Sequence, residues 1–350
     1  MRRMTAALAV ALLAMLTTTS ATLACGGLIG PNGAVNLLRT STLAGYHAGV
    51  EHYITAFEFA GGGGAFGSIT PLPGVPSDVV KGGDWTLQRL VRETEPVDQR
   101  LRFDAFASAP ATSGEAQVIL ERRIDALDIT VLKGGADEVG LWAKNHGFRL
   151  PPDAPEVLEF YASRSPIFLA AAFDADAAAQ RGQDIGDGTP IHVTIPTTNP
   201  WVPLRILGLG KSAAERIEAD VYLLTDRQPA LLPSPRSPGL DLAFDEAASD
   251  LLLDDLRSDT GMEWVPDAAW LTKIRIDASP GQLRFDLAID ATGQRTPSRV
   301  AAGFDTVAPG RGAASDRTAT SLLGVGVTFI VLGLIALVLP VTRRRWARGR

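Results

Sequence analysis

The feature that most constrains this chain is an uncharged segment near its C-terminus, which begins at Ser321 and ends at Val341. About 21 helical residues at about 1.5 Å each reach about 31 Å, which matches a hydrocarbon core of about 30 Å. Five arginines follow between Arg343 and Arg350, and such a basic flank faces the cytoplasm. The pattern predicts a transmembrane helix at residues 321–341 and a basic cytoplasmic tail at residues 342–350. A buried core helix is the alternative, but such a helix rarely ends in a basic block.

The N-terminus has the three parts of a secretory signal peptide. Two arginines precede an apolar run from Ala6 to Leu16, and small residues follow this run. The run is too short to cross a bilayer, so we expect cleavage of the signal peptide at residues 1–24. Cys25 then becomes the first mature residue, either as a free thiol or as a lipidation site of the bacterial lipoprotein type. Thr22 stands where the lipoprotein signal normally has leucine.

The region between the two signals is long enough to bury a core of its own. We expect an extracytoplasmic domain at residues 25–305, which forms one unit or two close subdomains. Residues 306–320 are rich in alanine, glycine, serine and threonine, a composition typical of a flexible linker. The expected topology is a single-pass type I protein of the cell membrane, with its ectodomain outside and its C-terminus in the cytoplasm.

Charge and cysteine content exclude several classes of function. The chain has 39 acidic and 33 basic residues, and removal of the seven arginines at its two ends takes the net charge from −6 to −13. This acidity argues against nucleic acid as a partner. A single cysteine excludes a disulfide scaffold and a thiolate zinc site within one chain. We expect no cofactor, and a partner that is an envelope protein or ligand.

The order of strand and helix patterns favours an α+β fold with mainly antiparallel sheet and a few helices. Runs rich in valine, isoleucine and threonine predict strands at residues 36–43, 50–60, 99–106, 117–123, 126–132, 166–173, 190–195, 202–207 and 217–224. Capping and apolar spacing predict helices at residues 85–94, 137–146, 155–162 and 242–257. Alternating apolar and charged side chains predict a β-hairpin of residues 271–277 and 282–290.

His47, Glu51 and His52 are the candidates for a metal site. One zinc-protease pattern, His-x-x-Glu-His, places both imidazoles on one helix face, but here the first spacing is one residue too long. Ala48 and Gly49 also favour a turn before a strand, which leaves two ordinary histidines at a hairpin. We therefore assign no metal ligand and no catalytic or cofactor-binding residue, and keep these three as weak candidates.

Acidic and aromatic residues suggest two further kinds of site. Glu246, Asp250 and Asp254 are spaced to share one face of the predicted helix, where a solvated face is the plain interpretation and calcium the alternative. Tryptophans outside the membrane segment are either core residues or the floor of a sugar or peptide groove. They are Trp85, Trp142, Trp201, Trp264 and Trp270.

Several segments together resemble one bacterial family. They are the sequence ACGG at residues 24–27, VEHYITAFEF at 50–59, PLPGVP at 71–76, and VGLWAKNHGFRLPP at 139–152 followed by Phe160 and Tyr161. The chain resembles the bacterial domain of unknown function 2330 over most of residues 25–226. This resemblance implies an exported or membrane-anchored protein, and it supplies no catalytic residue.

These observations favour a binding, scaffold or accessory module of the bacterial cell envelope. The alternative is an extracytoplasmic metal-dependent or hydrolytic enzyme. That alternative requires His47, Glu51 and His52 to converge in one pocket.

Overall fold

The computed structural model describes residues 27–31, 33–34, 37–39, 41–56, 58–59, 66–95, 118–174 and 189–305. They lie within one unit, Met1–Thr306. The predicted signal peptide, Cys25, the linker, the transmembrane segment and the tail lie outside the described residues. Among the residues that are described, no helix is both long and apolar enough to cross a membrane.

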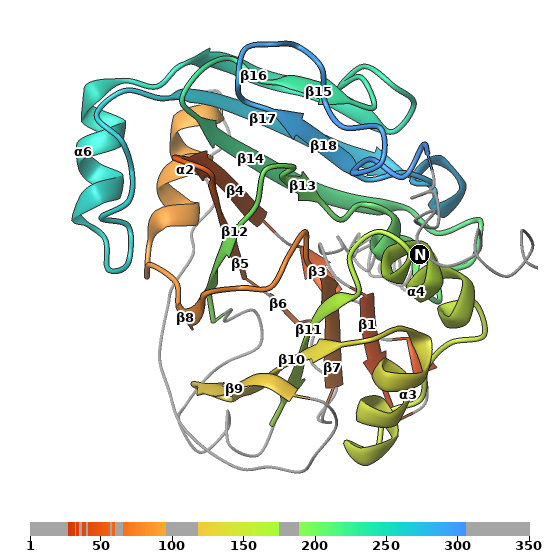
Figure 1. The fold of residues 1–350 in the computed structure, drawn as a ribbon. Helices are drawn as coiled ribbons and strands as arrows, with labels where there is room; N and C mark the ends of the chain where they lie inside the picture. The colour runs from red at the N-terminus through yellow and green to blue at the C-terminus, as the bar shows by residue number, and fades with distance from the viewer. Residues whose placement is uncertain are drawn as a thin grey trace, which may run out of the picture. The chain divides into compact units, whose positions relative to one another are not determined.

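A seven-stranded sheet forms the larger layer (Figure 1). Its strands in spatial order are β16 (Leu240–Ala247), β17 (Trp270–Ala278), β14 (Ile217–Thr225), β4 (Ser41–His47), β5 (Val50–Thr55), β12 (Ile191–Pro196) and β8 (Asp78–Lys81). Neighbouring strands are antiparallel except β14 and β4. Ala48 and Gly49, both with positive φ, make the tight turn between β4 and β5.

A six-stranded antiparallel sheet forms the second layer. Its order is β2 (Gly33–Ala34), β1 (Gly27–Gly30), β7 (Phe66–Pro71), β11 (Ile167–Phe173), β10 (Leu127–Lys133) and β9 (Val118–Ile124). The smaller pairings join β13 (Trp201–Val202), β18 (Leu287–Asp290) and β15 (Ala230–Leu232), and β3 (Leu37–Arg39) with β6 (Glu58–Phe59).

Four α-helices and two short 3-10 helices complete the described part of the chain. They are α2 (Thr86–Thr94), α3 (Ala136–Asn145), α4 (Ala154–Ala162), α6 (Asp250–Ser258), η1 (Arg205–Gly208) and η2 (Pro280–Gln282). Asp259 anchors the start of helix α2, because its carboxylate accepts hydrogen bonds from the N–H groups of Asp84 and Trp85 and from the hydroxyl of Thr86. These contacts fix the entry into the helix and place a negative charge beside its N-terminus.

The seven-stranded sheet separates two hydrophobic cores. The inter-sheet core joins both large sheets and includes Ile29, Tyr53, Ile69, Phe168, Val193 and Val221. The helix-side core lies under α2 and α6 and includes Leu43, Ile54, Leu90, Tyr222, Leu252 and Leu256. Tyr53 and Ile54 are neighbours in β5 but enter different cores, because side chains alternate along a strand.

The predicted α+β class with mainly antiparallel sheet is confirmed, while two local predictions are wrong. Residues 242–257 are not one helix, because their first half pairs with β17 as β16 and only the part after the Ser249 cap is helical. Residues 271–277 and 282–290 do not pair with each other: β17 joins the seven-stranded sheet and β18 pairs with β13 and β15.

Three further differences separate the predicted elements from the described ones. Residues 202–207 contain the end of β13 and then the 3-10 helix η1, and residues 99–106 lie outside the described part of the chain. Strands β7 and β8 were not predicted, because glycine and proline interrupt the first and only four residues form the second.

Candidate functional site

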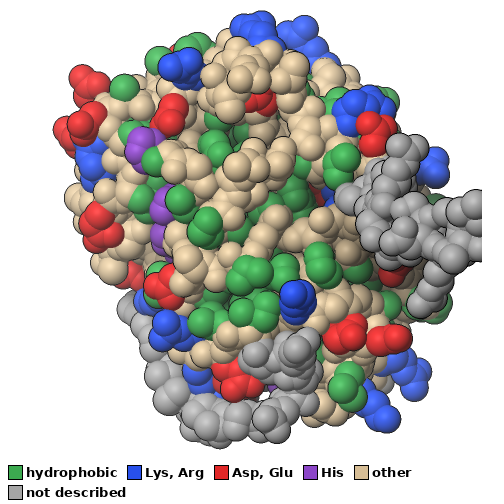
Figure 2. All heavy atoms as spheres, viewed as in Figure 1, with side chains coloured by type: hydrophobic (Ala, Val, Ile, Leu, Met, Phe, Trp, Pro, Cys, Tyr) green, Lys and Arg blue, Asp and Glu red, His purple; other side chains and the backbone are tan. Residues whose placement is uncertain are grey.

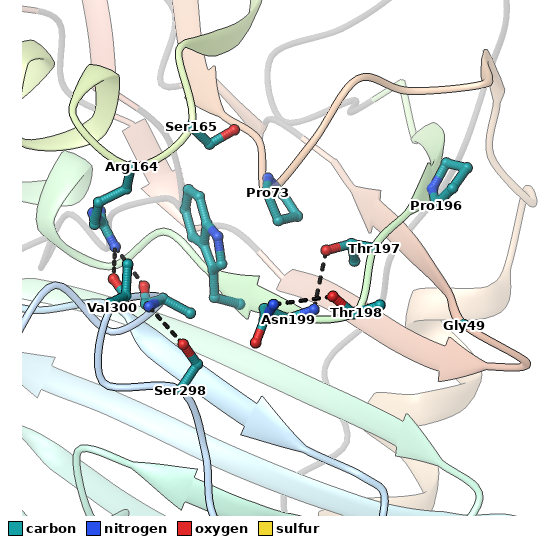
Figure 3. Close-up of a pocket in the computed structure, with 12 residues that line it drawn as sticks. Gly49, Pro73, Arg164, Ser165, Pro196, Thr197, Thr198, Asn199, Ser298 and Val300 are labelled. Carbon is teal, nitrogen blue, oxygen red and sulfur yellow. Dashed lines mark hydrogen bonds between the residues drawn. The ribbon is translucent and has the colours of Figure 1, made fainter. Parts of the chain in front are cut away.

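A pocket of about 650 Å³ opens beside Trp201 (Figure 3). Gly49 enters it from the β4–β5 turn, Pro196 from the end of β12, Arg164 from the end of α4 and Ser298 from the segment after β18. The other described residues of the lining are Pro73, Ser165, Thr197, Thr198, Asn199, Val300 and Ala301. Segments far apart in sequence therefore build one concave surface.

Three lining hydroxyl groups are held with their hydrogens free to donate. Thr197 Oγ1 accepts from the Asn199 N–H at 3.2 Å, and Thr198 Oγ1 accepts from Asn199 Nδ2 at 3.0 Å. Ser298 Oγ accepts from the Ala301 N–H at 3.1 Å. A hydroxyl that accepts still carries its own hydrogen, so all three can donate to a ligand.

Among the described residues of the lining, Arg164 is the one charged side chain, and its charge is already compensated. Its Nη2 lies 2.6 Å from Asp286 Oδ2, and the two side chains are 4% and 0% exposed. Its Nε donates to the Phe160 carbonyl at 3.1 Å, and its Nη1 donates to the carbonyls of Val300 and Ala301. The guanidinium therefore fixes the pocket wall and leaves no uncompensated charge for a ligand.

Asp286 also ties the elements around the pocket together. Its Oδ1 accepts from the Tyr161 hydroxyl at 2.8 Å and from the N–H groups of Leu204 and Arg205 at 2.9 and 3.0 Å. The Tyr161 oxygen in turn accepts from the Ile206 N–H at 2.8 Å. This buried network joins α4, η1 and the segment before β18.

Glu51 lies behind the pocket in the inter-sheet layer. Its Oε2 accepts the Trp201 N–H at 3.3 Å, while its buried Oε1 has no hydrogen-bond partner among the described residues. Burial raises the pKa of Glu51 to about 8, and the Trp201 N–H opposes this only in part. The carboxyl group is therefore mostly protonated at neutral pH.

A family comparison identifies the domain. The model of a bacterial family described as an uncharacterized protein conserved in bacteria, domain of unknown function 2330 (DUF2330), matches residues 20–275. The chain belongs to this family. No curated protein matches it.

Two solved structures show a remote likeness to the DUF2330 chain. The crystal structure of baculovirus P35 has a TM-score of 0.37 at 9% identity and covers 73% of this chain and 92% of that one. A mutated baculovirus P35 after caspase cleavage has a TM-score of 0.39 at 8% identity and covers 72% and 99%. Likeness at this level is too remote to indicate a common fold or activity.

The DUF2330 domain does not bring the three weak metal candidates together. His47 lies at the surface, where its Nδ1 is 2.7 Å from Asp226 Oδ1. Glu51 and His52 are consecutive in β5, so their side chains leave opposite faces of the sheet. The convergence that the metal-enzyme alternative requires of these three residues is not formed.

His52 instead meets a histidine that the sequence analysis did not select. Its Nδ1 lies 3.0 Å from His192 Nε2, and its ring stacks on Trp264 with centroids 4.0 Å apart. Figure 2 shows some histidine side chains, in purple, at the surface of this view, on the side of the molecule where Figure 1 shows α2. The two histidines are 140 residues apart, and only the pairing of β5 with β12 reveals that they share a face.

The other sequence candidates separate or lie elsewhere. Glu246 is in β16 whereas Asp250 and Asp254 are in α6, so the three do not share one helix face. Within the described ranges, no group of three or more histidine, cysteine, aspartate or glutamate side chains is arranged to hold a metal ion. Of the five tryptophans, Trp201 lines the pocket and Trp264 covers His52.

Proposed function

We propose that this DUF2330 chain is a membrane-anchored binding module of the bacterial envelope, and that its ligand is small, neutral and polar. The ligand site is the pocket beside Trp201. The signal peptide at residues 1–24 exports the domain, and the helix at residues 321–341 holds it to the membrane with residues 342–350 in the cytoplasm. The −13 charge of the part between the basic ends supports a partner other than nucleic acid.

The observation that carries this proposal is the chemistry of the lining. The described residues around the pocket supply hydroxyl, amide and apolar groups, and none of them titrates near neutral pH. General acid–base catalysis needs such a group within hydrogen-bond reach of the substrate. A pocket that can hold a ligand but offers no acid or base favours binding over hydrolysis.

The same lining defines the class of ligand. The free hydroxyl hydrogens of Thr197, Thr198 and Ser298 suit a ligand rich in acceptor oxygens, and the compensated charge of Arg164 gives no preference for an anion. Pro73 and Pro196 supply apolar ring surface at the rim. Neutral saccharides combine acceptor hydroxyls with apolar faces and fit this lining best.

The test uses the full-length chain recovered from bacterial membranes in mild detergent. Ligand-observed NMR compares neutral mono- and disaccharides with the corresponding uronic acids, which keep the ring but add a carboxylate. We expect the chain in the membrane fraction, and saturable signals from neutral sugars that exceed those from the acids. Asn199→Leu should abolish the signals, because it replaces a polar lining group with an apolar one and removes the contact that positions Thr198.

Asn145→Leu is the matched control, since Asn145 is exposed at the end of α3, away from the pocket lining. Binding that survives Asn199→Leu would place the ligand outside this pocket. A preference for the acids would contradict a neutral ligand. A chain found only in the soluble fraction would refute the membrane anchor without touching the binding result.

A further inference from the structure

His52 and His192 are held together on the opposite face of the seven-stranded sheet from Glu51. His52 Nδ1 and His192 Nε2 lie 3.0 Å apart, and the residues are 9% and 5% exposed. Both histidines lie in regular strands whose register is continuous across β5 and β12. The two nitrogen atoms are thus placed by backbone pairing and not by a mobile loop.

The surroundings of the pair fix the ring of His52. Trp264 stacks on it with an interplanar angle of 3°, and Gly45 on the neighbouring strand leaves room for the indole. A Cβ at position 45 would lie 2.0 Å from Trp264 Cη2. The glycine therefore permits the stack. The indole holds the imidazole in place, as the groups behind a metal-binding histidine do.

From this arrangement we propose that His52 Nδ1 and His192 Nε2 together bind one divalent transition-metal ion of the zinc or copper class. A tetrahedral ion at 2.0–2.1 Å from each nitrogen holds the two nitrogens about 3.3 Å apart. The two nitrogens must therefore move apart by about 0.3 Å, and both rings must turn, because nitrogens that share one hydrogen point at each other whereas two metal ligands point at a common ion. A rotation of His52 within its own ring plane keeps the imidazole parallel to Trp264.

The protonation of the pair suits this role. Burial lowers the pKa of His52 to about 3 and that of His192 to about 4, so both imidazoles are neutral at pH 7. In the metal-free pair one ring donates its N–H hydrogen to the other. On metal binding that hydrogen leaves the shared position and the same ring takes one up at its outer nitrogen, so no net proton is released.

Local charge favours a cation next to this pair. The carboxylates of Asp78 in β8 and Glu263 beside Trp264 act electrostatically on His192, and both work against the effect of its burial. Asp78 also pairs with Arg122 at 3.2 Å, and His47 acts on His52 in the opposite sense, so Glu263 is the less compensated of the two. In the described part of the chain no third protein ligand completes a cluster. Water or a donor atom from a partner must then fill the remaining coordination positions. Neither histidine lines the pocket beside Trp201, so this site is independent of that pocket.

The experiment titrates Zn²⁺ alone into the full-length protein in detergent at neutral pH, with an affinity tag that contains no histidine. Calorimetry should show one saturable site, and Cu²⁺ in its place should give an electron paramagnetic resonance spectrum with coupling to two imidazole nitrogens. His52→Gln and His192→Gln should each weaken Zn²⁺ binding by more than about tenfold, because each removes one of two ligands.

His146→Gln is the matched control, because His146 ends α3 and its Nδ1 contacts the Trp142 carbonyl. Circular dichroism without metal identifies any variant that fails to fold, and the copper spectrum of the wild-type chain tests the site without substitution. Absence of saturable Zn²⁺ binding to the wild-type chain would overturn the proposal. So would full binding by both folded glutamine variants, or a copper spectrum without two nitrogen couplings.

Discussion

Glu51 and His52 are adjacent in β5, yet they experience the same physical effect in opposite directions. Glu51 enters the inter-sheet layer, where burial raises its pKa to about 8. His52 enters the layer under α2 and α6, where burial lowers its pKa to about 3. Desolvation penalises the charged form of either group, so both side chains are mainly neutral at pH 7. The comparison shows that one strand can bury an acid and a base without pairing them.

Both sides retain buried charge, but the groups that surround it differ. The inter-sheet side keeps the Arg164–Asp286 ion pair, and four hydrogen bonds to Asp286 compensate the cost of its burial. The helix side places His52 against His192, where two neutral rings satisfy each other. The helix side also buries an ion pair, in which Lys273 Nζ lies 3.2 Å from Asp220 Oδ2 and both side chains are 1% exposed. Charge is therefore retained on both sides, and the two neutral nitrogen ligands are what the helix side adds.

The largest expected effect is the pH response of Glu51→Gln. The pKa of Glu51 is 4.5 in the unfolded chain and about 8 in the folded protein. At a pH between these two values, the unfolded chain has lost a proton that the folded protein keeps. The free energy of unfolding of the wild type should therefore fall as pH rises through this range, by up to about 5 kcal/mol. The glutamine variant lacks this loss and should match the wild type near pH 5 but exceed its stability at pH 9, as measured by urea denaturation.

Glu246→Gln provides the matched control, because Glu246 is exposed at the edge strand β16 and should leave the profile unchanged. The acid side of the profile should also be unaffected by Glu51→Gln. There, stability falls as pH drops below 6.5, since the unfolded chain protonates His52 and His192 while the folded chain resists. Parallel profiles for wild type and Glu51→Gln above pH 5 would contradict the assignment of Glu51.

The second effect concerns the retained charge. Asp286→Ala removes four hydrogen bonds and leaves the buried Arg164 without its partner, which should cost about 3–5 kcal/mol. Asp259→Ala on the helix side removes three hydrogen bonds to a carboxylate at the start of α2 and should cost about 1.5–3 kcal/mol. Urea denaturation of both variants at pH 7 checks the order. An Asp259 variant that is less stable than the Asp286 variant would contradict this order.

Sequence patterns predicted those elements whose signals are local. Helix α3 ends before Gly147, which has a φ of +75°, and the β4–β5 turn forms at Ala48 and Gly49 as expected. The error at residues 242–257 has a non-local cause. Asp245 accepts hydrogen bonds from Trp270 and Thr272 on β17, and this pairing overrides a helical spacing of apolar residues.

The sites were harder to predict, because they depend on register. Glu51 and His52 are adjacent in sequence, which suggested a cluster, but alternation along β5 separates them. His192 joins His52 only through the β5–β12 pairing, and no local pattern encodes that pairing. The pocket unites Gly49, Arg164, Asn199 and Ser298 in the same way, so none of these stood out in the sequence.

An effect smaller than the loss of the Arg164–Asp286 pair tests the support behind His52. In Gly45→Ala the new Cβ would lie 2.0 Å from Trp264 Cη2, so the indole must move off the imidazole. Such overpacking should cost about 1–3 kcal/mol.

Gly140→Ala is the matched control, since its Cβ would find Leu150 at an ordinary 3.8 Å and alanine favours a helix by about 1 kcal/mol. Thermal unfolding and tryptophan fluorescence measure both variants. If Gly45→Ala kept the wild-type fluorescence and melting temperature, Trp264 would not be held as described. If it lost stability while the inter-sheet pH response of Glu51 stayed intact, the two faces of β5 would be energetically separate.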